Sequence, residues 1–248
     1  MLTKLIALAR LYWVDPELAV LAWKLKRAHH TYLGFPHLWS LVESFLRMRS
    51  RGADPLQVAE FGVGRGGSAT LLAWLVGRYG GTLTLFDVFG RIPPPTIRDG
   101  ERAQDRYRTI LTRETSDYYG NLPNLLDLIM ADLEAVCPKD RVEIVRGRYE
   151  DTLPAQARRR SLGLVHIDCD WYESVRSVLA YLQNNLRPDA IIQIDDYSNW
   201  QGARRATDEA TWLQPFQARL VDGVLVIDTS ARKTRPEYRS NDLARPLR

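Results

Sequence analysis

The sequence predicts an α/β fold, in which a mostly parallel β-sheet flanked by helices ends in an antiparallel hairpin and is preceded by a helical cap. From residue 56 onward, short apolar runs alternate with segments of helical periodicity, which is the pattern of repeated βα units. Near the end, Asp222-Gly223 separates two apolar runs and predicts a tight hairpin turn. The 248 residues are 45% hydrophobic and 26% charged, a balance that excludes a disordered or fibrous chain.

Residues 1–50 are expected to form the helical cap. Apolar residues recur at helical spacing in three stretches, at residues 5–12, 18–25 and 38–48. Pro16 suits the first turn of the second helix, and Asp15 suits its N-cap position.

Residues 51–230 are expected to form the sheet domain, with a tail at 231–248. The expected strands are 56–61, 82–87, 142–147, 162–168 and 190–195, followed by the hairpin strands 216–220 and 224–229. The expected helices between them include 68–79, 174–185 and 202–212. An insertion at 88–141 is far longer than an ordinary connection, and it holds two helical stretches, at about 100–114 and 124–136. We expect this insertion to build the substrate side of a site.

A glycine-rich loop follows the first expected strand and opens the next helix. Its sequence, EFGVGRGGS at residues 60–68, satisfies the G-x-G-x-x-G pattern through Gly62, Gly64 and Gly67. Glycines allow a sharp turn and the close approach of a ligand, although a plain strand-to-helix turn also explains them. Asp87 ends the next strand, where a carboxylate can bind a ribose diol. Together these features predict an adenosine-containing cofactor, either a dinucleotide or S-adenosylmethionine.

Two features favour S-adenosylmethionine over a dinucleotide. The carboxylate of Glu60, immediately before the loop, suits a cationic methionine group better than a pyrophosphate. The terminal hairpin adds an antiparallel strand, which is typical of the methyltransferase variant of this sheet. An NAD(P)-dependent oxidoreductase is the alternative that G-x-G-x-x-G followed by Asp87 leaves open, although no Tyr-x-x-x-Lys pair is recognisable.

Four aspartates follow two of the expected strands. HIDCD places Asp168 and Asp170 at the end of one strand, and IDDY places Asp195 and Asp196 at the end of the next. Ligands of open α/β sheets bind beyond the carboxyl ends of the strands, and carboxylates gathered there repel one another unless a cation lies between them. Oxygen ligands without His or Cys suit Mg²⁺. The competing interpretation, that Asp195 or Asp196 caps the next helix or starts a turn, accounts for one aspartate rather than four.

Three further side chains and one loop each have a simple structural explanation. His166 lies in an apolar strand and is expected to be a core histidine, while Cys169 is expected to be a small buried hydrophobe. His37 could reach a substrate, but a surface or helix-start position is favoured. The loop GRYEDTLP at 147–154 follows a strand and by position borders the adenine end of a cofactor, although a simple loop is equally compatible.

The net charge of +4 allows an anionic partner but does not identify one. The basic clusters Arg158–Arg160 and Arg204-Arg205 lack an interleaved aromatic stripe, so no nucleic-acid partner is expected. Two cysteines make neither a disulfide framework nor a zinc motif, and no apolar run reaches the length of a membrane span. With no signal peptide recognised, we expect a cytoplasmic protein without a membrane partner, whose helical cap and tail could pack against another subunit in a homo-oligomer.

Several segments resemble, in order and spacing, the macrocin O-methyltransferase family. They are EFGVGRGGS, FDVFGRIPPP, SDYYG, GRYEDTLP, HIDCDWYES and IDDYSNWQGARRATDE, and together they span about residues 30–229. The family consists of S-adenosylmethionine- and Mg²⁺-dependent enzymes, many of which methylate sugar hydroxyls of bacterial natural products. The resemblance implies a Rossmann-like class I methyltransferase fold, these two cofactors and a small hydroxylated acceptor such as a sugar.

The resemblance also implies a role for each matching residue. The implied metal ligands are Asp168, Asp195 and Asp196, and the implied general base is Asp170. The implied cofactor residues are Glu60, Gly62, Gly64, Gly66 and Ser68 at the methionine end, Asp87 at the ribose, and Arg148 and Tyr149 at the adenine. The hypothesis is direct methyl transfer to a hydroxyl, in which Asp170 accepts the proton. Besides the oxidoreductase, a non-catalytic binding module and an RNA methyltransferase are weaker alternatives.

Overall fold

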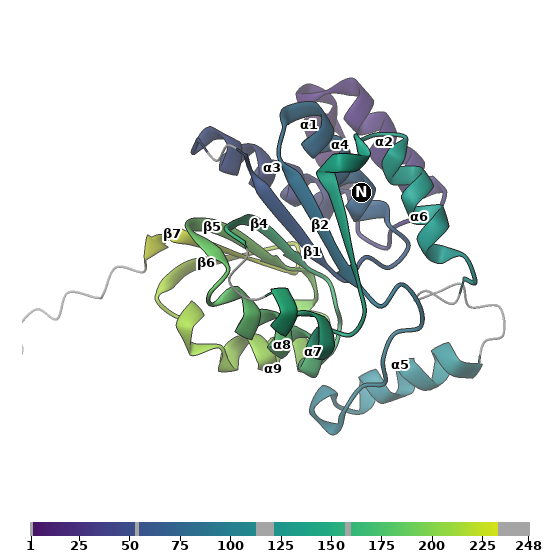
Figure 1. Ribbon diagram of the computed structural model, residues 1–248, viewed down its shortest axis with the longest axis vertical. Helices are drawn as coiled ribbons and strands as arrows, with labels where there is room; N and C mark the ends of the chain where they lie inside the picture. The colour runs from purple at the N-terminus through teal and green to yellow at the C-terminus, as the bar shows by residue number, and fades with distance from the viewer. Residues whose placement is uncertain (1, 53–54, 113–121, 157–159, 233–248) are drawn as a thin grey trace, which may run out of the picture.

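The computed structural model describes residues 2–52, 55–112, 122–156 and 160–232, and in them the strands form one sheet of order β3-β2-β1-β4-β5-β7-β6 (Figure 1). The strands are β1 Gln57–Phe61, β2 Thr82–Asp87, β3 Val142–Arg146, β4 Leu162–Ile167, β5 Leu186–Ile194, β6 Phe216–Val221 and β7 Val224–Arg232. β1 to β5 pair in parallel, whereas β7 is antiparallel to β5 and β6 is antiparallel to β7. The predicted fold class is confirmed.

The hairpin turn forms for the reason that its two residues suggest. Asp222 and Gly223 both have positive φ, 50° and 98°, as a two-residue turn between twisted antiparallel strands requires. The turn reverses the chain between β6 and β7, so β7 can pair with β5 in the opposite direction to the parallel strands.

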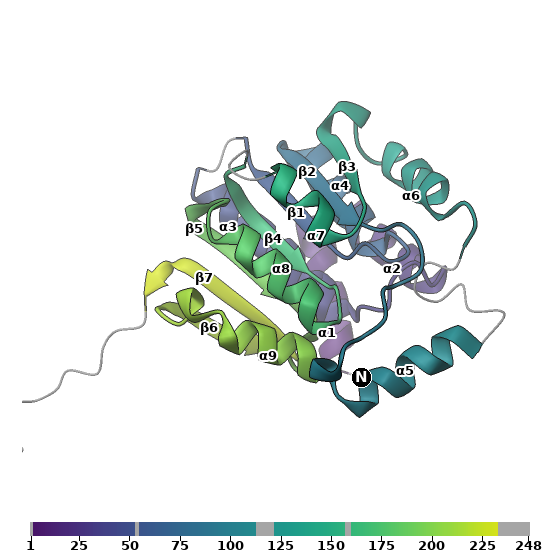
Figure 2. The same cartoon turned by 60° about the horizontal axis from the view of Figure 1, so that its bottom comes forward.

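Helices cover both faces of the sheet (Figure 2). The helices on the first face are α1 Leu2–Val14, α2 Pro16–Arg27, α3 Phe35–Ser50, α4 Gly67–Tyr79 and α6 Leu125–Glu134. Those on the second face are α7 Tyr149–Thr152, α8 Tyr172–Leu182 and α9 Gln201–Glu209. Strand alternation divides the core accordingly, with Leu83 and Leu85 facing the first layer and Phe61 and Phe86 the second.

The helix α5, Glu101–Thr112, lies apart from both layers, beyond the edge at which the parallel strands end (Figures 1 and 2). It comes from the long insertion, whose SDYYG segment at 116–120 falls outside the described residues. The tail from residue 233 onward also falls outside them. The expected helix at 100–114 is therefore found at Glu101–Thr112 as far as the structure describes it.

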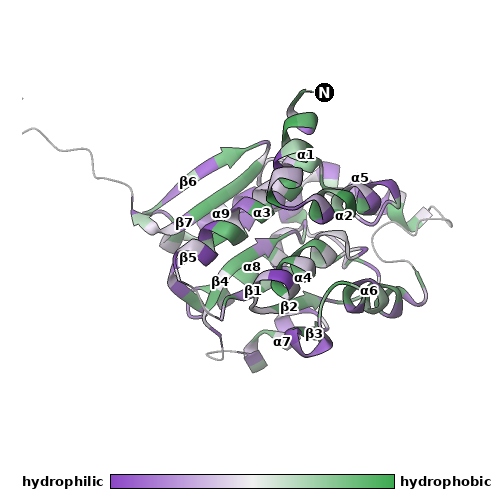
Figure 3. Ribbon diagram, turned by 90° about the horizontal axis from the view of Figure 1, so that it is seen from above, coloured by the Kyte–Doolittle hydropathy of each residue, from purple (hydrophilic) through white to green (hydrophobic). Residues whose placement is uncertain are grey.

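The N-terminal helices form as their sequence predicts. The carboxylate of Asp15 accepts the backbone N–H of Glu17 at 2.9 Å, and Pro16 occupies the first turn of α2. α1 carries many apolar residues (Figure 3), and several of them are exposed, Trp13 to 87%. Among the described residues, no helix is long and apolar enough to cross a membrane.

Several element boundaries differ from the prediction, among them the start of β5 and the end of α9. β5 begins at Leu186, four residues before the expected start, because Leu186 pairs with Leu162 across an irregularity in the ladder. The sequence does not predict this start because a proline, Pro188, and two charged residues, Arg187 and Asp189, are untypical of a strand. The helix expected at 202–212 ends at Glu209 and is followed by a 3₁₀ turn, Thr211–Leu213.

Candidate active site

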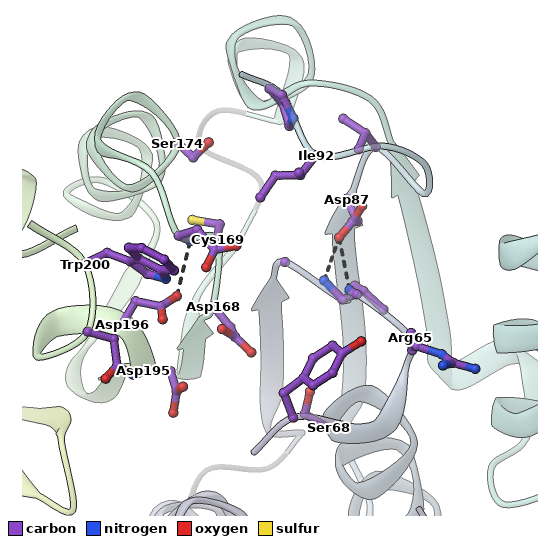
Figure 4. A pocket seen from close by; sticks show the side chains of 18 of the residues that line it. Arg65, Ser68, Asp87, Ile92, Asp168, Cys169, Ser174, Asp195, Asp196 and Trp200 are labelled. Atoms are coloured by element: carbon purple, nitrogen blue, oxygen red, sulfur yellow. Dashed lines mark hydrogen bonds between the residues drawn. The ribbon is translucent and has the colours of Figure 1, made fainter. Parts of the chain in front are cut away.

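A cavity of about 660 Å³ opens at the carboxyl ends of the parallel strands. One side is the loop after β1 together with the end of β2, and the other is the pair of loops after β4 and β5. Figure 4 shows this arrangement, with Asp87, Arg65 and Ser68 on one side and Asp168, Asp195, Asp196 and Trp200 on the other. The position agrees with the rule that open α/β sheets bind ligands at this edge.

The glycine loop turns where side chains would not fit. Gly62 has φ of 90°, and a Cβ there would lie 1.9 Å from the carbonyl oxygen of Asp168. At Gly67, the first residue of α4, a Cβ would lie 2.5 Å from the Cβ of Thr31. The loop therefore packs directly against both the end of β4 and the segment that joins α2 to α3.

Asp87 braces the glycine loop from the end of β2. Its Oδ2 accepts the backbone N–H groups of Val63 at 2.7 Å and Gly64 at 3.3 Å, and its Oδ1 accepts that of Phe89 at 2.7 Å (Figure 4). Burial raises the pKa of Asp87, and the three N–H donors oppose that shift by stabilising the carboxylate. The sequence analysis places Asp87 at the ribose; in the structure it lines the cavity and also fixes the loop.

Asp168, Asp195 and Asp196 come together at the ends of β4 and β5. One carboxylate oxygen from each lies within 4.8 Å of the others, a grouping that could hold a metal ion. Burial and then the charges of Asp195 and Asp196 raise the pKa of Asp168 well above its usual value. Burial and Asp195 raise that of Asp196 to about 7. Three carboxylates in such a space resist ionising together unless positive charge is added.

The alternative for Asp195 and Asp196 had two parts. They do start a turn, the 3₁₀ turn Asp195–Tyr197, but neither caps α9. The N-cap residue of α9 is Trp200, which makes no side-chain capping bond. Oδ2 of Asp196 instead accepts the backbone N–H of Asp170 at 3.2 Å, back across the cavity edge (Figure 4). The side chain of Asp196 thus ties the loop after β4 to the loop after β5.

Asp170 adopts a left-handed backbone conformation, with φ of 58°, in the loop after β4. Such a conformation is uncommon for residues other than glycine, and it concentrates at functional sites. Burial and the charge of Asp196 raise the pKa of Asp170 well above its ordinary value, while a hydrogen bond from Trp200 and the charge of Arg106 oppose that shift. Asp170 lines the same cavity as the three-aspartate group.

Glu60 and His166 form a buried pair beneath the cavity. His166 Nδ1 lies 2.8 Å from Oε1 of Glu60, and neither residue is more than 1% exposed. The expectation of a core histidine is confirmed. Glu60 and Gly66, both expected at the methionine end, do not line the cavity, and Gly66 instead packs against Ile129 of α6.

The other expected cofactor residues do line the cavity. They are Gly62, Gly64, Ser68, Asp87, Arg148 and Tyr149. The hydroxyl of Tyr149 donates to the carbonyl oxygen of Phe86 at 3.4 Å, and its ring packs edge-on against Phe61. Cys169 is 8% exposed, as expected of a small buried residue, and it too lines the cavity.

A family model described as Macrocin-O-methyltransferase (TylF) matches residues 23–228, which is most of the chain. The chain belongs to this family. It is therefore an S-adenosylmethionine-dependent O-methyltransferase, and the oxidoreductase alternative is excluded. The resemblance predicted from the sequence motifs is confirmed.

One relative of known description and two solved structures are similar to this chain. A Streptomyces olivaceus protein described as 8-demethyl-8-(2,3-dimethoxy-alpha-L-rhamnosyl)-tetracenomycin-C 4'-O-methyltransferase is 28% identical over 188 residues, covering 74% of this chain and 68% of the relative. The O-methyltransferase NovP has a similar structure, with a TM-score of 0.66, 22% identity, and coverage of 82% of this chain and 83% of that one. The calicheamicin methyltransferase CalS11 has a TM-score of 0.62 and 20% identity. The match covers 90% of this chain and 91% of that one. Both structures show the same fold.

His37 lines the cavity, a possibility that the sequence left open but did not favour. It sits in the first turn of α3, as expected, but its Nδ1 lies 3.0 Å from Oδ1 of Asp195, and its Nε2 lies 3.0 Å from the carbonyl oxygen of Asp222. The contact with Asp195 raises the pKa of His37 and so favours the charged imidazolium. Proximity to a partner 158 positions away in a different layer leaves no local signal in the sequence.

Two further segments close the macrocin O-methyltransferase cavity. The first was not expected there, whereas the second includes α5, part of the insertion that the sequence predicts on the substrate side. The segment from His30 to Leu33 lies over the glycine loop, where the backbone N–H of Gly67 donates to the carbonyl oxygen of His30 at 2.9 Å. His30 also pairs with Asp132 of α6, Nδ1 to Oδ2, at 2.9 Å. α5 and Trp200 close the opposite side. The helical cap thus lines the glycine-loop side of the cavity.

Proposed function

We propose that this macrocin O-methyltransferase transfers the methyl group of S-adenosylmethionine to a hydroxyl of a sugar in a bacterial natural product, with Mg²⁺ held by the aspartate group. The observation that carries the proposal is one cavity with a glycine loop and Asp87 on one side and a cluster of buried aspartates on the other. The Streptomyces olivaceus relative is described as acting on a rhamnosyl group, which supports a sugar acceptor.

The residues beside the glycine loop fit S-adenosylmethionine. In this proposal Gly62, Gly64 and Ser68 bind the methionine end, Asp87 the ribose, and Arg148 and Tyr149 the adenine, and all six line the cavity. Glu60 lies behind the cavity wall, where its charge can act on the cofactor. Its Oε2 is buried with no hydrogen-bond partner among the described residues, so a cationic cofactor group nearby would stabilise it. When bound, the cofactor supplies a methyl group on a positively charged sulfur.

Asp168, Asp195 and Asp196 fit a hard divalent cation. They offer only oxygen ligands, they lie within ligating distance of one another, and their crowding raises the pKa values of Asp168 and Asp196. Mg²⁺ bound there would supply positive charge that lowers the pKa of an acceptor hydroxyl. His37 holds Asp195 in its orientation from the outer side.

Asp170 is the proposed general base. Its strained backbone directs the side chain into the cavity beside the aspartate group, where it can accept the hydroxyl proton as the oxygen–methyl bond forms and the methyl–sulfur bond breaks. Trp200 donates a hydrogen bond that fixes the carboxylate and favours its ionised form. The two sides of the cavity together hold oxygen and methyl in line, which supplies much of the rate.

The proposed oligomer is a homo-oligomer formed through α1 and α2. Leu5, Tyr12, Trp13, Val20 and Trp23 surround an apolar groove on the outer face of these helices. α1 carries Lys4 and Arg10, and α2 begins with Glu17, so a second copy can bury the aromatic side chains while it pairs opposite charges. The double variant Trp13→Ser/Trp23→Ser is expected to have a smaller molar mass in light scattering. A molar mass equal to that of the wild type would contradict the proposal.

A cytoplasmic location is also proposed. The two cysteines, Cys137 and Cys169, are both free and buried, as suits a reducing compartment.

The decisive experiment measures S-adenosylhomocysteine release with a rhamnose-bearing acceptor, with and without EDTA. Turnover that EDTA abolishes and Mg²⁺ restores is the expected result. Full turnover in EDTA would contradict the proposed metal role. Turnover of non-sugar hydroxyls alone would contradict the proposed sugar acceptor.

A further inference from the structure

A second hollow, which we call the α5–α9 hollow, lies next to the active-site cavity where the starts of these two helices meet. Its volume is about 360 Å³, within the range of about 300–1,000 Å³ that is typical of small-molecule sites. Besides the ring of Trp200, it is lined by polar side chains, those of Asp99, Arg102, Ser198, Asn199, Gln201 and Arg204. Trp200, Arg102 and Asn199 also line the cavity, so the cavity and the hollow share one wall.

This shared wall is held in place from several directions. The rings of Trp200 and Trp171 pack edge-on with their centroids 5.2 Å apart, and Nε1 of Trp171 donates to the carbonyl oxygen of Pro93 at 2.9 Å. The guanidinium of Arg102 lies over Trp200, 5.0 Å from the ring centroid, and its Nη1 donates to the carbonyl oxygen of Asn199 at 3.1 Å. Figure 4 shows Trp200 on the same side of the cavity as the aspartate group. The hollow is therefore a fixed neighbour of the side where the acceptor hydroxyl is proposed to react.

The floor of the α5–α9 hollow is equally well anchored. Asp99 is only 1% exposed, and its Oδ1 accepts the backbone N–H of Tyr172 at 2.6 Å. A Cβ on Gly202 would lie 1.9 Å from the same oxygen, so α9 packs directly against Asp99. A Cβ on Gly100 would lie 2.7 Å from Oε1 of Gln201, so the side chain of Gln201 reaches across from α9 to the start of α5. The hollow is thus built from two elements that are locked together.

Three side chains of the hollow have polar groups that the chain does not use. Among the described residues, the hydroxyl of Ser198 and the carboxamides of Asn199 and Gln201 make no hydrogen bond. Hydroxyls and carboxamides both donate and accept hydrogen bonds, and so does each hydroxyl of a sugar. An anion only accepts, and would leave the oxygens of both carboxamides without a donor. These groups therefore match a neutral, hydroxylated ligand.

The two arginines of the hollow are compatible with such a ligand because the chain already holds both. Arg102 is fixed by Trp200 and Asn199, and Nε of Arg204 donates to the carbonyl oxygen of Tyr197 at 3.1 Å while its guanidinium lies over the Tyr197 ring. Each guanidinium keeps further N–H donors, which can bind sugar hydroxyls. The arginines thus widen the set of donors around the hollow.

We propose that the α5–α9 hollow binds a second sugar ring of the acceptor, joined to the ring that is methylated. The inference rests on the proposed sugar O-methyltransferase activity and deepens it, because it makes the preferred acceptor at least a disaccharide. The methylated ring lies in the cavity with its hydroxyl facing Asp170, and the glycosidic bond passes the shared wall at Trp200. Hydroxyls of the second ring then bind Ser198, Asn199 and Gln201.

The proposal also gives the enzyme a place in a reaction sequence. An acceptor with two joined sugar rings must already contain the bond between them, so the class of reaction that supplies it is glycosyl transfer. Methylation then follows the joining of the two rings. Methyl transfer to a free hydroxyl leaves the glycosidic bond intact.

The first test compares acceptors that differ only in what is attached to one rhamnose. They are methyl rhamnoside, cyclohexyl rhamnoside and rhamnosyl-glucose in each of its linkage isomers. At least one disaccharide is expected to have a KM at least about tenfold lower than that of methyl rhamnoside, because its second ring adds several hydrogen bonds. Cyclohexyl rhamnoside, which has the bulk of a second ring without its hydroxyls, is expected to resemble methyl rhamnoside.

Three outcomes of this comparison would overturn the proposal. They are equal KM values for all the acceptors, a cyclohexyl rhamnoside used as well as the best disaccharide, and a clear preference for rhamnosyl-glucuronic acid over rhamnosyl-glucose. The first would show that nothing binds in the hollow, the second that its polar groups play no part, and the third that it selects an acid.

Variants of the hollow separate a binding role from a structural one. Gln201 and Ser198 line the hollow but not the cavity. Gln201→Ala is expected to raise the KM for the preferred disaccharide about five- to tenfold, because one or two hydrogen bonds are lost. The KM for methyl rhamnoside and both kcat values should stay at their wild-type levels. Ser198→Ala should raise the same KM by a smaller factor, and it carries the test if Gln201→Ala has a lowered melting temperature.

Gln214→Ala is the matched control for Gln201→Ala. Gln214 is an exposed glutamine at the end of the 3₁₀ turn after α9, and it lines neither the cavity nor the hollow. Its variant is expected to keep wild-type KM values for both kinds of acceptor. Equal increases in the two KM values for Gln201→Ala and Ser198→Ala would indicate a structural role and contradict the proposal.

A binding measurement distinguishes failure of this inference from failure of the proposed function. Calorimetry of the S-adenosylhomocysteine-loaded protein with the rhamnosyl-glucose isomers reports binding without turnover. Disaccharide binding that Gln201→Ala weakens, without methylation of any sugar, would support the hollow as a sugar site and contradict the sugar methyltransferase. Methylation of methyl rhamnoside, with no disaccharide bound more tightly than it, would support the methyltransferase and contradict the second site.

Discussion

The two sides of the cavity treat buried carboxylates in opposite ways. Asp87, at the end of β2, has both oxygens bound by backbone N–H groups of Val63, Gly64 and Phe89. At the ends of β4 and β5, Asp168, Asp195 and Asp196 face one another. The chain itself satisfies the first carboxylate, so it acts as a brace. The chain crowds the other three carboxylates together, so a bound cation would stabilise them.

Removing the metal, or one of its proposed ligands, is expected to have the largest effect on activity. EDTA, or Asp168→Asn, is expected to reduce kcat by about 10³-fold, because a bound cation contributes several kcal/mol to charge stabilisation in the transition state. Rates of S-adenosylhomocysteine release check this. Calorimetry of S-adenosylhomocysteine binding is the control, and it should change little, since the cofactor side lies elsewhere in the cavity. Wild-type rates for both would contradict the proposed metal role.

Asp170→Asn tests whether the left-handed aspartate accepts the proton. We expect kcat to fall about 10²- to 10³-fold with Mg²⁺ affinity unchanged, because the amide keeps the shape but cannot take the proton. Asp105→Asn, another cavity carboxylate, provides the matched control. A variant with wild-type kcat would assign the base to another group.

Asp87→Asn tests whether the carboxylate of Asp87 stabilises the glycine loop. One oxygen becomes an NH₂ group that cannot accept the N–H of Val63 or Phe89, so a buried bond is lost at a cost of about 1–3 kcal/mol. We expect a lower melting temperature and weaker cofactor binding, by about tenfold or more, without a change in metal affinity. A variant as stable as wild type would show that the glycine loop needs no brace.

The pH dependence of stability should differ with and without metal. In the metal-free protein the pKa of Asp196 is raised to about 7 from an ordinary 3.8, so the folded state binds a proton that the unfolded state has lost. The metal-free protein is therefore expected to be most stable below about pH 4 with respect to this group, and to lose that stability as the pH rises to about 7. Mg²⁺ should raise the melting temperature at pH 8 and have little effect at pH 5. An equal effect at both values would contradict the assignment.

His37→Gln is expected to have the smallest effect. Glutamine removes the imidazolium beside Asp195 but leaves the cation ligands in place, so Mg²⁺ affinity and kcat should fall severalfold at most. Titration of activity against Mg²⁺ concentration measures this. A loss as large as that of Asp168→Asn would make His37 a direct participant.

The sequence predicted what arises from local pattern. The strand ends, the glycine loop and the four aspartates follow from periodicity and from the rule that parallel strands end at one edge, so Asp168, Asp195 and Asp196 could be grouped before their distances were known. Asp87 was recognised for the same reason. Its hydrogen bonds to the loop were not, because they depend on how the loop folds back.

The residues that sequence reasoning missed are those brought in by tertiary packing. His37 accompanies Asp195 because α3 crosses the end of β5, and its second partner, Asp222, is 185 residues away along the chain. Arg102 gains its place because Asp99 fixes the start of α5 against α8. Neither position carries a periodic or compositional signal. Glu60 was placed at the cavity wall from its position in the motif, whereas strand alternation turned it inward to His166.

The contact between His37 and the carbonyl oxygen of Asp222 has a consequence for how the site matures during synthesis. The glycine loop and Asp87 are made early by the ribosome, but Asp195 gains its histidine in the observed orientation only when the turn between β6 and β7 has been made and has docked. A nascent chain would therefore complete the glycine-loop side of the cavity before the aspartate side. The contact between His37 and Asp222 would take its observed form only after the hairpin has folded onto β5.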